Sequence, residues 1–249
     1  MKKTFLSIVI VISLVLPACK HDKLEIPQPV TQEVKFVFKN VIDGAPVQKG
    51  SMSYYNAAGN NYSVDLLKYY ISNIVLVRSD QLEYKATNYE LIDIDSPSSL
   101  SFSVTGAPPG YYTAVKFKMG IDSTSNFSGP QNGDLDPVNG MLWDWNSGYV
   151  FFKHEGYFMD STGVQTEVHF HYGTLKALVS EELPVSLIIP EQGQNTIEVT
   201  FNLNKIYASP NIMNFNGDNF HQSTGPGENG WVQLLKENFD GAFEITSVQ

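Results

Sequence analysis

The sequence predicts an all-β protein, a single-domain antiparallel β-sandwich with one short helix near the C-terminus. Short segments in which apolar and polar residues alternate recur along the chain, as expected of half-buried strands. Turn-forming residues separate these segments, for example at residues 43–44, 108–110 and 132–133. No helices alternate with the strands, which argues against a parallel α/β sheet. No linker divides the chain after residue 31, so we expect one domain over residues 32–249.

Five segments carry the strand pattern most clearly. Residues 34–38 and 115–119 alternate apolar with polar side chains, and residues 196–203 do so most regularly. The segment of residues 67–77 is longer and more apolar, which indicates a central strand of a sheet. Prolines lie in and just after the segment of residues 183–189, so we expect an edge or terminal strand there.

The expected helix lies close to the C-terminus. Trp231, Leu235 and Phe239 have helical spacing, and Gly241 is a suitable residue to end the helix. A short final strand over residues 242–248 is expected to follow.

The N-terminus has the pattern of a secretory lipoprotein signal. Lys2 and Lys3 precede an apolar run over residues 5–16, which is too short to span a bilayer. Small residues then precede Cys19, as in a bacterial lipobox. We therefore expect a signal peptide over residues 1–18 and lipidation of Cys19, with a free thiol as the alternative.

The polar residues that follow predict a tether between the lipid and the domain. Residues 19–31 contain two prolines and few apolar side chains. We expect the chain to lie in the cell envelope of a Gram-negative bacterium, as an outer membrane-anchored lipoprotein. The sequence leaves open whether it faces the periplasm or the surface.

The charge and the single cysteine exclude several kinds of protein. The formal net charge is −10, so the chain should not bind nucleic acid non-specifically, and its field favours cations. Because Cys19 is the only cysteine, an intramolecular disulfide is impossible.

Two histidines have a spacing that suits a metal site. On a strand, His169 and His171 lie on one face, with their Cα atoms about 7 Å apart. Both imidazoles can then reach one metal ion, although two polar residues on a solvated sheet face would look the same. The other imidazoles of the domain, those of His154 and His221, are further candidate metal ligands, and Met141 offers a thioether that suits Cu(I).

Two tryptophans lie close to these groups in the sequence. Trp143 and Trp145 occupy one face of an extended segment between a turn and an aromatic strand. They either line a site or anchor the core or rim of the sandwich. Asp122, Asp134 and Asp136 could serve a hard cation, and turn formation is the alternative explanation for them.

No motif of a catalytic site is present. The sequence has no phosphate loop, dinucleotide fingerprint, nucleophile elbow or zinc-protease helix. We therefore expect a protein that is not an enzyme. Residues 214–230 are rich in Gly and Asn and predict a long ordered loop that could line a site.

With these residues in view, the chain resembles the MbnP-like family of secreted copper-binding proteins. The resemblance rests on an ordered series of segments, of which the tryptophan-containing one is the most specific: residues 67–74, 119–122, 135–149, 154–156, 170–173 and 235–243. It implies a β-sandwich and a bound copper ion. The first part of the domain, as far as the strand of residues 69–74, contains no histidine, unlike the copper-binding branch of the family.

The resemblance also implies roles for particular residues. In better-known members, a partner di-haem enzyme oxidises a tryptophan to kynurenine, which helps to bind the metal. That role falls to Trp143 or Trp145, and the resemblance does not choose between them. His171 best matches the family histidine, and His169 is an additional candidate.

We therefore expect a lipid-anchored copper-binding protein that acts in copper acquisition or handling. It would have no organic cofactor, a membrane contact through its lipid, and a di-haem cytochrome c peroxidase-like partner. The alternative is a non-catalytic surface lipoprotein that binds glycans or proteins, since 13 Tyr, 15 Phe and 3 Trp supply many rings that could stack on sugars. An exposed, flat tryptophan platform would favour this alternative.

Overall fold

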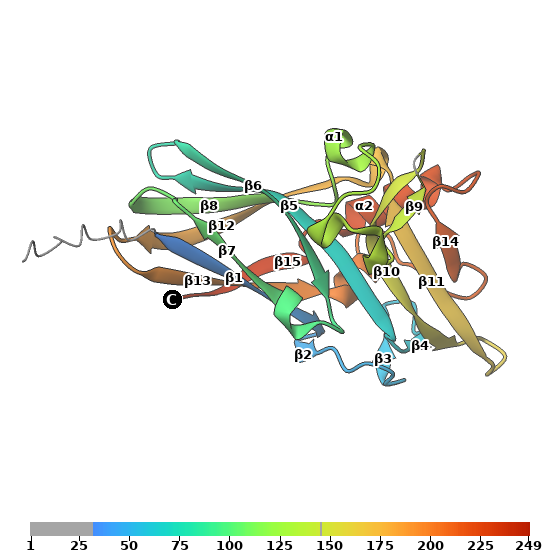
Figure 1. The fold of residues 1–249 in the computed structure, drawn as a ribbon. Helices are drawn as coiled ribbons and strands as arrows, with labels where there is room; N and C mark the ends of the chain where they lie inside the picture. Colours follow the sequence, from blue (N-terminus) through green and yellow to red (C-terminus); the bar gives the residue numbers. More distant parts are fainter. Residues whose placement is uncertain (1–31, 145) are drawn as a thin grey trace, which may run out of the picture.

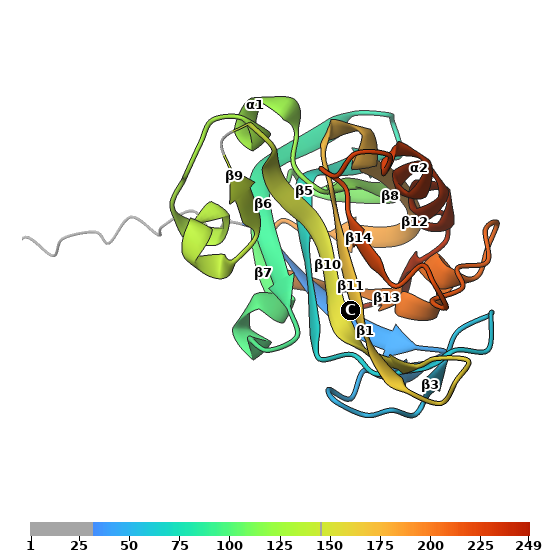
Figure 2. The same ribbon diagram turned by 90° about the vertical axis from the view of Figure 1, so that its right-hand side faces the viewer.

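The computed structural model describes residues 32–144 and 146–249, apart from the side chains of residues 87 and 88. Two β-sheets pack against each other, and the larger one curls strongly (Figures 1 and 2). The expected signal peptide, the tether with Cys19, and Trp145 lie outside the described residues.

The smaller sheet is built around the first strand of the domain. Its order is β15-β13-β1-β2, and β7 also pairs with β1. The strands are β1 (Glu33–Ile42), β2 (Ala45–Pro46), β7 (Ser101–Thr105), β13 (Gln194–Asn202) and β15 (Phe243–Val248). β1 runs parallel to β13, whereas the other pairs in this sheet are antiparallel. The expectation of a purely antiparallel sandwich is therefore corrected to a mixed one.

The larger sheet has the order β12-β8-β5-β10-β11-β14 along its main path. These strands are β5 (Leu66–Arg78), β8 (Gly110–Met119), β10 (Gly148–Met159), β11 (Gln165–Gly173), β12 (Val179–Ile189) and β14 (Phe220–Gln222). Four further strands attach to this path: β3 (Tyr54–Tyr55), β4 (Asn61–Tyr62), β6 (Glu83–Asp93) and β9 (Leu142–Asp144). β14 runs parallel to β11, so this sheet is mixed as well.

The strand that was expected to be central is central. β5 pairs with β6 along one edge, and with β10 and then β8 along the other. β5 changes partner between Tyr69 and Ile71, and a bulge follows at Asn73, which has a φ of 53°. β12, which contains Pro184, lies at one end of the sheet, as predicted for an edge strand.

Aromatic side chains from both sheets fill the space between them. Phe201 of the smaller sheet lies with its ring centroid 5.0 Å from that of Tyr69 in the larger sheet and 4.7 Å from that of Phe243. Phe38 of β1 contacts Phe117 of β8 edge to face. Large buried rings contribute much of the hydrophobic stabilisation of a fold, so this layer holds the two sheets together.

The helix predicted near the C-terminus is present as α2 (Asn229–Asn238), which buries Trp231 and Leu235 against the sandwich. A second helix, α1 (Ser123–Asn126), was not expected; the side chain of Asp122 caps it. Short 3-10 helices are η1 (Pro97–Leu100), η2 (Gly133–Leu135), η3 (Pro137–Asn139), η4 (Leu175–Ala177) and η5 (Leu203–Tyr207). Within the described residues, no helix has the length and apolar character needed to cross a membrane.

Candidate metal centre

Three potential metal ligands meet on the outward face of the β10–β11 hairpin. Alternation along β11 turns His169 and His171 away from the core, while Phe170 between them is buried. The hairpin register places Glu155 of β10 directly opposite His169. The predicted histidine pair is thus joined by a carboxylate that the sequence analysis did not select.

The three side chains are close enough to share one ion. The rings of His169 and His171 lie 3.7 Å apart at their centroids, with an interplanar angle of 37°. His171 Nε2 lies 2.7 Å from Glu155 Oε1. One ligand atom from each of the three residues lies within 4.8 Å of the others. Imidazole nitrogen and carboxylate oxygen are ordinary ligands of Zn²⁺ and Cu²⁺.

The protonation states suit a cation. Burial lowers the pKa of His171 to about 4, although the hydrogen bond to Glu155 acts in the opposite direction. Burial also lowers the pKa of His169. Burial raises the pKa of Glu155, but His171 and Lys153 outweigh it, so the net pKa is lowered. At neutral pH the cluster therefore holds neutral imidazoles and a charged carboxylate, the forms that ligate metals.

Two neighbours shape the surroundings of the cluster. The ring of Phe220 stacks on His169, with centroids 4.3 Å apart and an interplanar angle of 7°. Phe220 belongs to β14, inside the Gly/Asn-rich segment that was expected to line a site. On the other side, Lys153 Nζ lies 3.5 Å from Glu155 Oε1 and adds a positive charge beside the ligands.

Trp143 lies next to the outward row of β11. Gly173 follows His171 on the outward face of β11, two residues further along the strand. A Cβ atom at Gly173 would come within 2.7 Å of the Trp143 ring. Trp143 therefore lies over Gly173, where a larger residue would collide with its ring. Its Nε1 atom is buried and has no hydrogen-bond partner in the described structure. Trp143 is partly buried against the core and does not form an exposed, flat platform of the kind that stacks on sugars.

The structure does not bring His221 to this cluster. His221 lies opposite Phe170 in the β11–β14 pair, so its ring faces the interior. Its Nε2 lies 2.8 Å from Asp218 Oδ1 and its Nδ1 lies 2.7 Å from Glu228 Oε2. The ring also stacks on Trp231, with centroids 4.4 Å apart. Both nitrogens are thus engaged, and His221 anchors the strand that carries Phe220.

His154 and Met141 also lie away from the cluster. His154 precedes Glu155 on β10 and therefore points inward, where burial lowers its pKa to about 4. Its Nδ1 lies 2.6 Å from the hydroxyl of Tyr207, and its Nε2 lies 3.3 Å from the carbonyl oxygen of Ser63. Met141 is fully buried in the hydrophobic core. Alternation along β10 explains why His154 faces the interior.

The acidic residues proposed for a hard cation accept hydrogen bonds from backbone amides instead. Asp122 accepts hydrogen bonds from the first backbone amides of α1, and Asp136 accepts one from Val138 N at 2.9 Å. Asp134 accepts one from Leu91 N at 2.6 Å. Turn formation and helix capping, the alternative explanation, account for the contacts of Asp122 and Asp136, whereas Asp134 binds the backbone of β6.

Comparisons with known proteins agree with the fold and with the family that the sequence resembles. A family model described as MbnP matches residues 31–223. The solved structure of MbnP from Methylosinus trichosporium superposes with a TM-score of 0.51, covers 78% of this chain and 83% of that chain, and shares 18% sequence identity, so the likeness concerns the fold. No curated protein sequence matches the chain. Because the family model spans well over half of the sequence, the chain belongs to the MbnP family.

Proposed function

We propose that this protein is a non-catalytic copper-binding protein that holds one copper ion at Glu155, His169 and His171. The observation that carries the proposal is the convergence of two neutral imidazoles and a carboxylate on one outward sheet face. The chain belongs to the MbnP family, and its sequence resembles copper-binding members of that family. This supports copper as the metal. The role in the cell would be copper acquisition or handling.

The ligand set fits Cu²⁺ better than Cu⁺. Two nitrogens and one carboxylate oxygen bind divalent first-row metals, and Cu²⁺ binds such sets more tightly than Zn²⁺ does. A thioether would favour Cu⁺, but Met141 lies in the core, away from the cluster. The carboxylate also compensates part of the charge of a divalent ion. When bound, the ion would supply redox chemistry, while Phe220 would shield one face of the His169 ring.

Metal titration of the purified protein tests this proposal. We expect one equivalent of Cu²⁺ to bind, and Glu155→Gln to weaken binding roughly tenfold or more, the size seen for perturbed metal sites. The double variant His169→Ala/His171→Ala should bind no stoichiometric metal. Glu167→Gln is the matched control, because Glu167 is an exposed carboxylate on the same face of β11. Equal binding by the double variant and this control would refute the site.

We further propose that Trp143 is the tryptophan that a di-haem cytochrome c peroxidase-like partner oxidises to kynurenine. Its place over Gly173, beside the outward row of His169 and His171, supports this choice. Peptide mass spectrometry, with and without such an enzyme, measures the modification. We expect it at Trp143 and its loss in Trp143→Phe; modification confined to Trp145 would contradict the choice.

The location in the cell is proposed from the N-terminal sequence. We propose a lipid on Cys19 that anchors the protein to the outer membrane of a Gram-negative cell envelope. Cys19→Ser should move the protein from the membrane fraction to the soluble fraction. Unchanged partitioning of this variant would rule the anchor out.

A further inference from the structure

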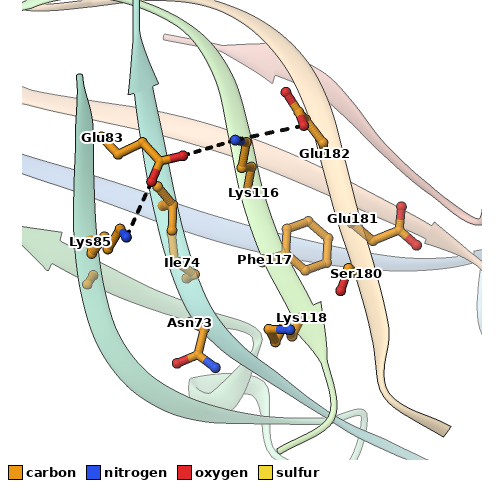
Figure 3. A pocket seen from close by; sticks show the side chains of 12 residues that line it. Asn73, Ile74, Glu83, Lys85, Lys116, Phe117, Lys118, Ser180, Glu181 and Glu182 are labelled. Carbon is orange, nitrogen blue, oxygen red and sulfur yellow. Dashed lines mark hydrogen bonds and ion pairs between the residues drawn. The ribbon is translucent and has the colours of Figure 1, made fainter. Parts of the chain in front are cut away.

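A groove of about 510 Å³ lies over β6, β5, β8 and β12, away from the hairpin that carries the metal cluster (Figure 3). Three lysines and three glutamates are among its lining residues, although the chain as a whole has a formal net charge of −10. Its volume falls within the range of small-molecule sites, roughly 300–1,000 Å³. The distribution of charge within it indicates which ligand it suits.

One end of the groove is electrically balanced. Strand register aligns Lys85, Val75, Lys116 and Glu182 in one row across four strands. Lys116 Nζ lies 3.0 Å from Glu83 Oε1 and 3.9 Å from Glu182 Oε2. Lys85 Nζ lies 3.4 Å from Glu83 Oε2. Figure 3 shows Lys116 between the two carboxylates, so this row offers no free positive charge.

The other end has an uncompensated ammonium group. Lys118 is the next residue of β8 on this face, and Ser180 of β12 lies opposite it. In the structure described, Lys118 makes no ion pair or side-chain hydrogen bond, and the hydroxyl of Ser180 is exposed and equally free. Figure 3 shows Lys118 apart from the network of Glu83, Lys116 and Glu182.

Asn73 completes this end of the groove. It occupies the bulge of β5 with a φ of 53°, in the left-handed region that Asn tolerates better than most residues. Bulges re-aim side chains and are frequent beside binding sites. The Asn73 amide makes one long contact, at 3.5 Å, from Nδ2 to Asp122 Oδ2, so it retains capacity to donate to a ligand.

We propose that this groove binds a small amphipathic carboxylate. Its carboxylate would pair with Lys118 and accept hydrogen bonds from Ser180 and Asn73, while its apolar body would lie along Val75. A single unpaired ammonium suits a monoanion. Glu83 and Glu182 would repel a ligand with several negative charges. The proposal does not depend on the metal cluster, because the two share no residues.

Titration of the full chain with octanoate, followed by amide chemical shifts in NMR spectra, tests the proposal. Shifts should saturate and centre on residues around Lys118. Lys118→Gln should weaken octanoate binding about fivefold to tenfold, as expected when a partly desolvated charge pair worth about 1 kcal/mol is lost. Lys35→Gln is the matched control, because Lys35 lies on β1 in the other sheet.

Two further ligands distinguish the parts of the proposal. Octan-1-ol lacks the carboxylate and inorganic phosphate lacks the apolar body, so both should bind more weakly than octanoate. Added copper should leave octanoate binding unchanged. Non-saturating shifts, equal affinities of Lys118→Gln and Lys35→Gln, or equal binding of phosphate and octanoate would each overturn the proposal.

Discussion

Glu181 should make the folded protein less stable as the pH rises from about 4.5 toward neutrality. Its side chain faces the inside of β12 and its Oε1 atom is buried without a hydrogen-bond partner in the described structure. Burial, with a smaller contribution from Asp240, raises its pKa from 4.5 to about 7. The native state therefore retains a proton that the unfolded state releases. The contribution of Glu181 to the free energy of unfolding is fully present below about pH 4.5 and is lost as the pH rises to 7.

The size of this effect follows from the two pKa values. Each pH unit between them costs about 1.4 kcal/mol, so Glu181 should remove about 2.5 kcal/mol of folding free energy between pH 5 and pH 8. Glu181→Gln replaces the acid with a neutral amide and should cancel this loss. Urea unfolding of both proteins at the two pH values measures the difference, and exposed Glu182→Gln is the control. Parallel pH dependence of the original protein and Glu181→Gln would refute the reasoning.

Three further changes have defined outcomes. His154 has a pKa of about 4, below its usual 6.5. Its contribution to the free energy of unfolding is therefore fully present above pH 6.5 and is lost as the pH falls toward 4. His154→Gln should reduce, by about 2.5 kcal/mol, the stability lost between pH 7 and pH 4.5 in urea unfolding; an unchanged loss would contradict this. Phe220→Ala removes the ring stacked on His169 and should weaken Cu²⁺ binding roughly fivefold, since such pairs contribute about 0.5–1.5 kcal/mol. Phe127 is exposed and serves as the control, so Phe127→Ala should leave the affinity for Cu²⁺ unchanged in the same titration. Lys153→Gln removes a positive charge beside the ligands and should raise Cu²⁺ affinity about threefold at low salt, with a smaller gain at high salt; a weaker affinity would refute this.

Local pattern was sufficient to predict several of the long strands and two of the three residues of the metal cluster. Alternation placed His169 and His171 on one face, and the apolar length of residues 67–77 identified the central strand β5. Glu155 was missed because its place depends on the register of the β10–β11 hairpin. The turn at residues 160–163 could have supplied that register, since it fixes which residues lie opposite each other.

Long-range placement could not be derived from the same patterns. Nothing local indicates that β14 runs parallel to β11, and that pairing sends His221 inward and Phe220 outward. The inward position of His154 likewise depends on the register of β10 within the sheet. His154 and His221 were expected to join the two histidines of β11 as ligands. His154 precedes the outward-facing Glu155, and His221 lies opposite the buried Phe170, so both face the core.

The parallel pairing of β1 with β13 has a consequence for the order of assembly. Glu33 at the start of β1 lies opposite Gln194, and the pairing runs for nine residues. The first strand of the domain therefore has no permanent neighbour on that edge until nearly all of the polypeptide has been made. Closing so large a loop costs entropy before any contact compensates it, and such topologies fold slowly. We expect completion of this strand pair to be among the last events of folding, after the hairpins of the larger sheet have formed.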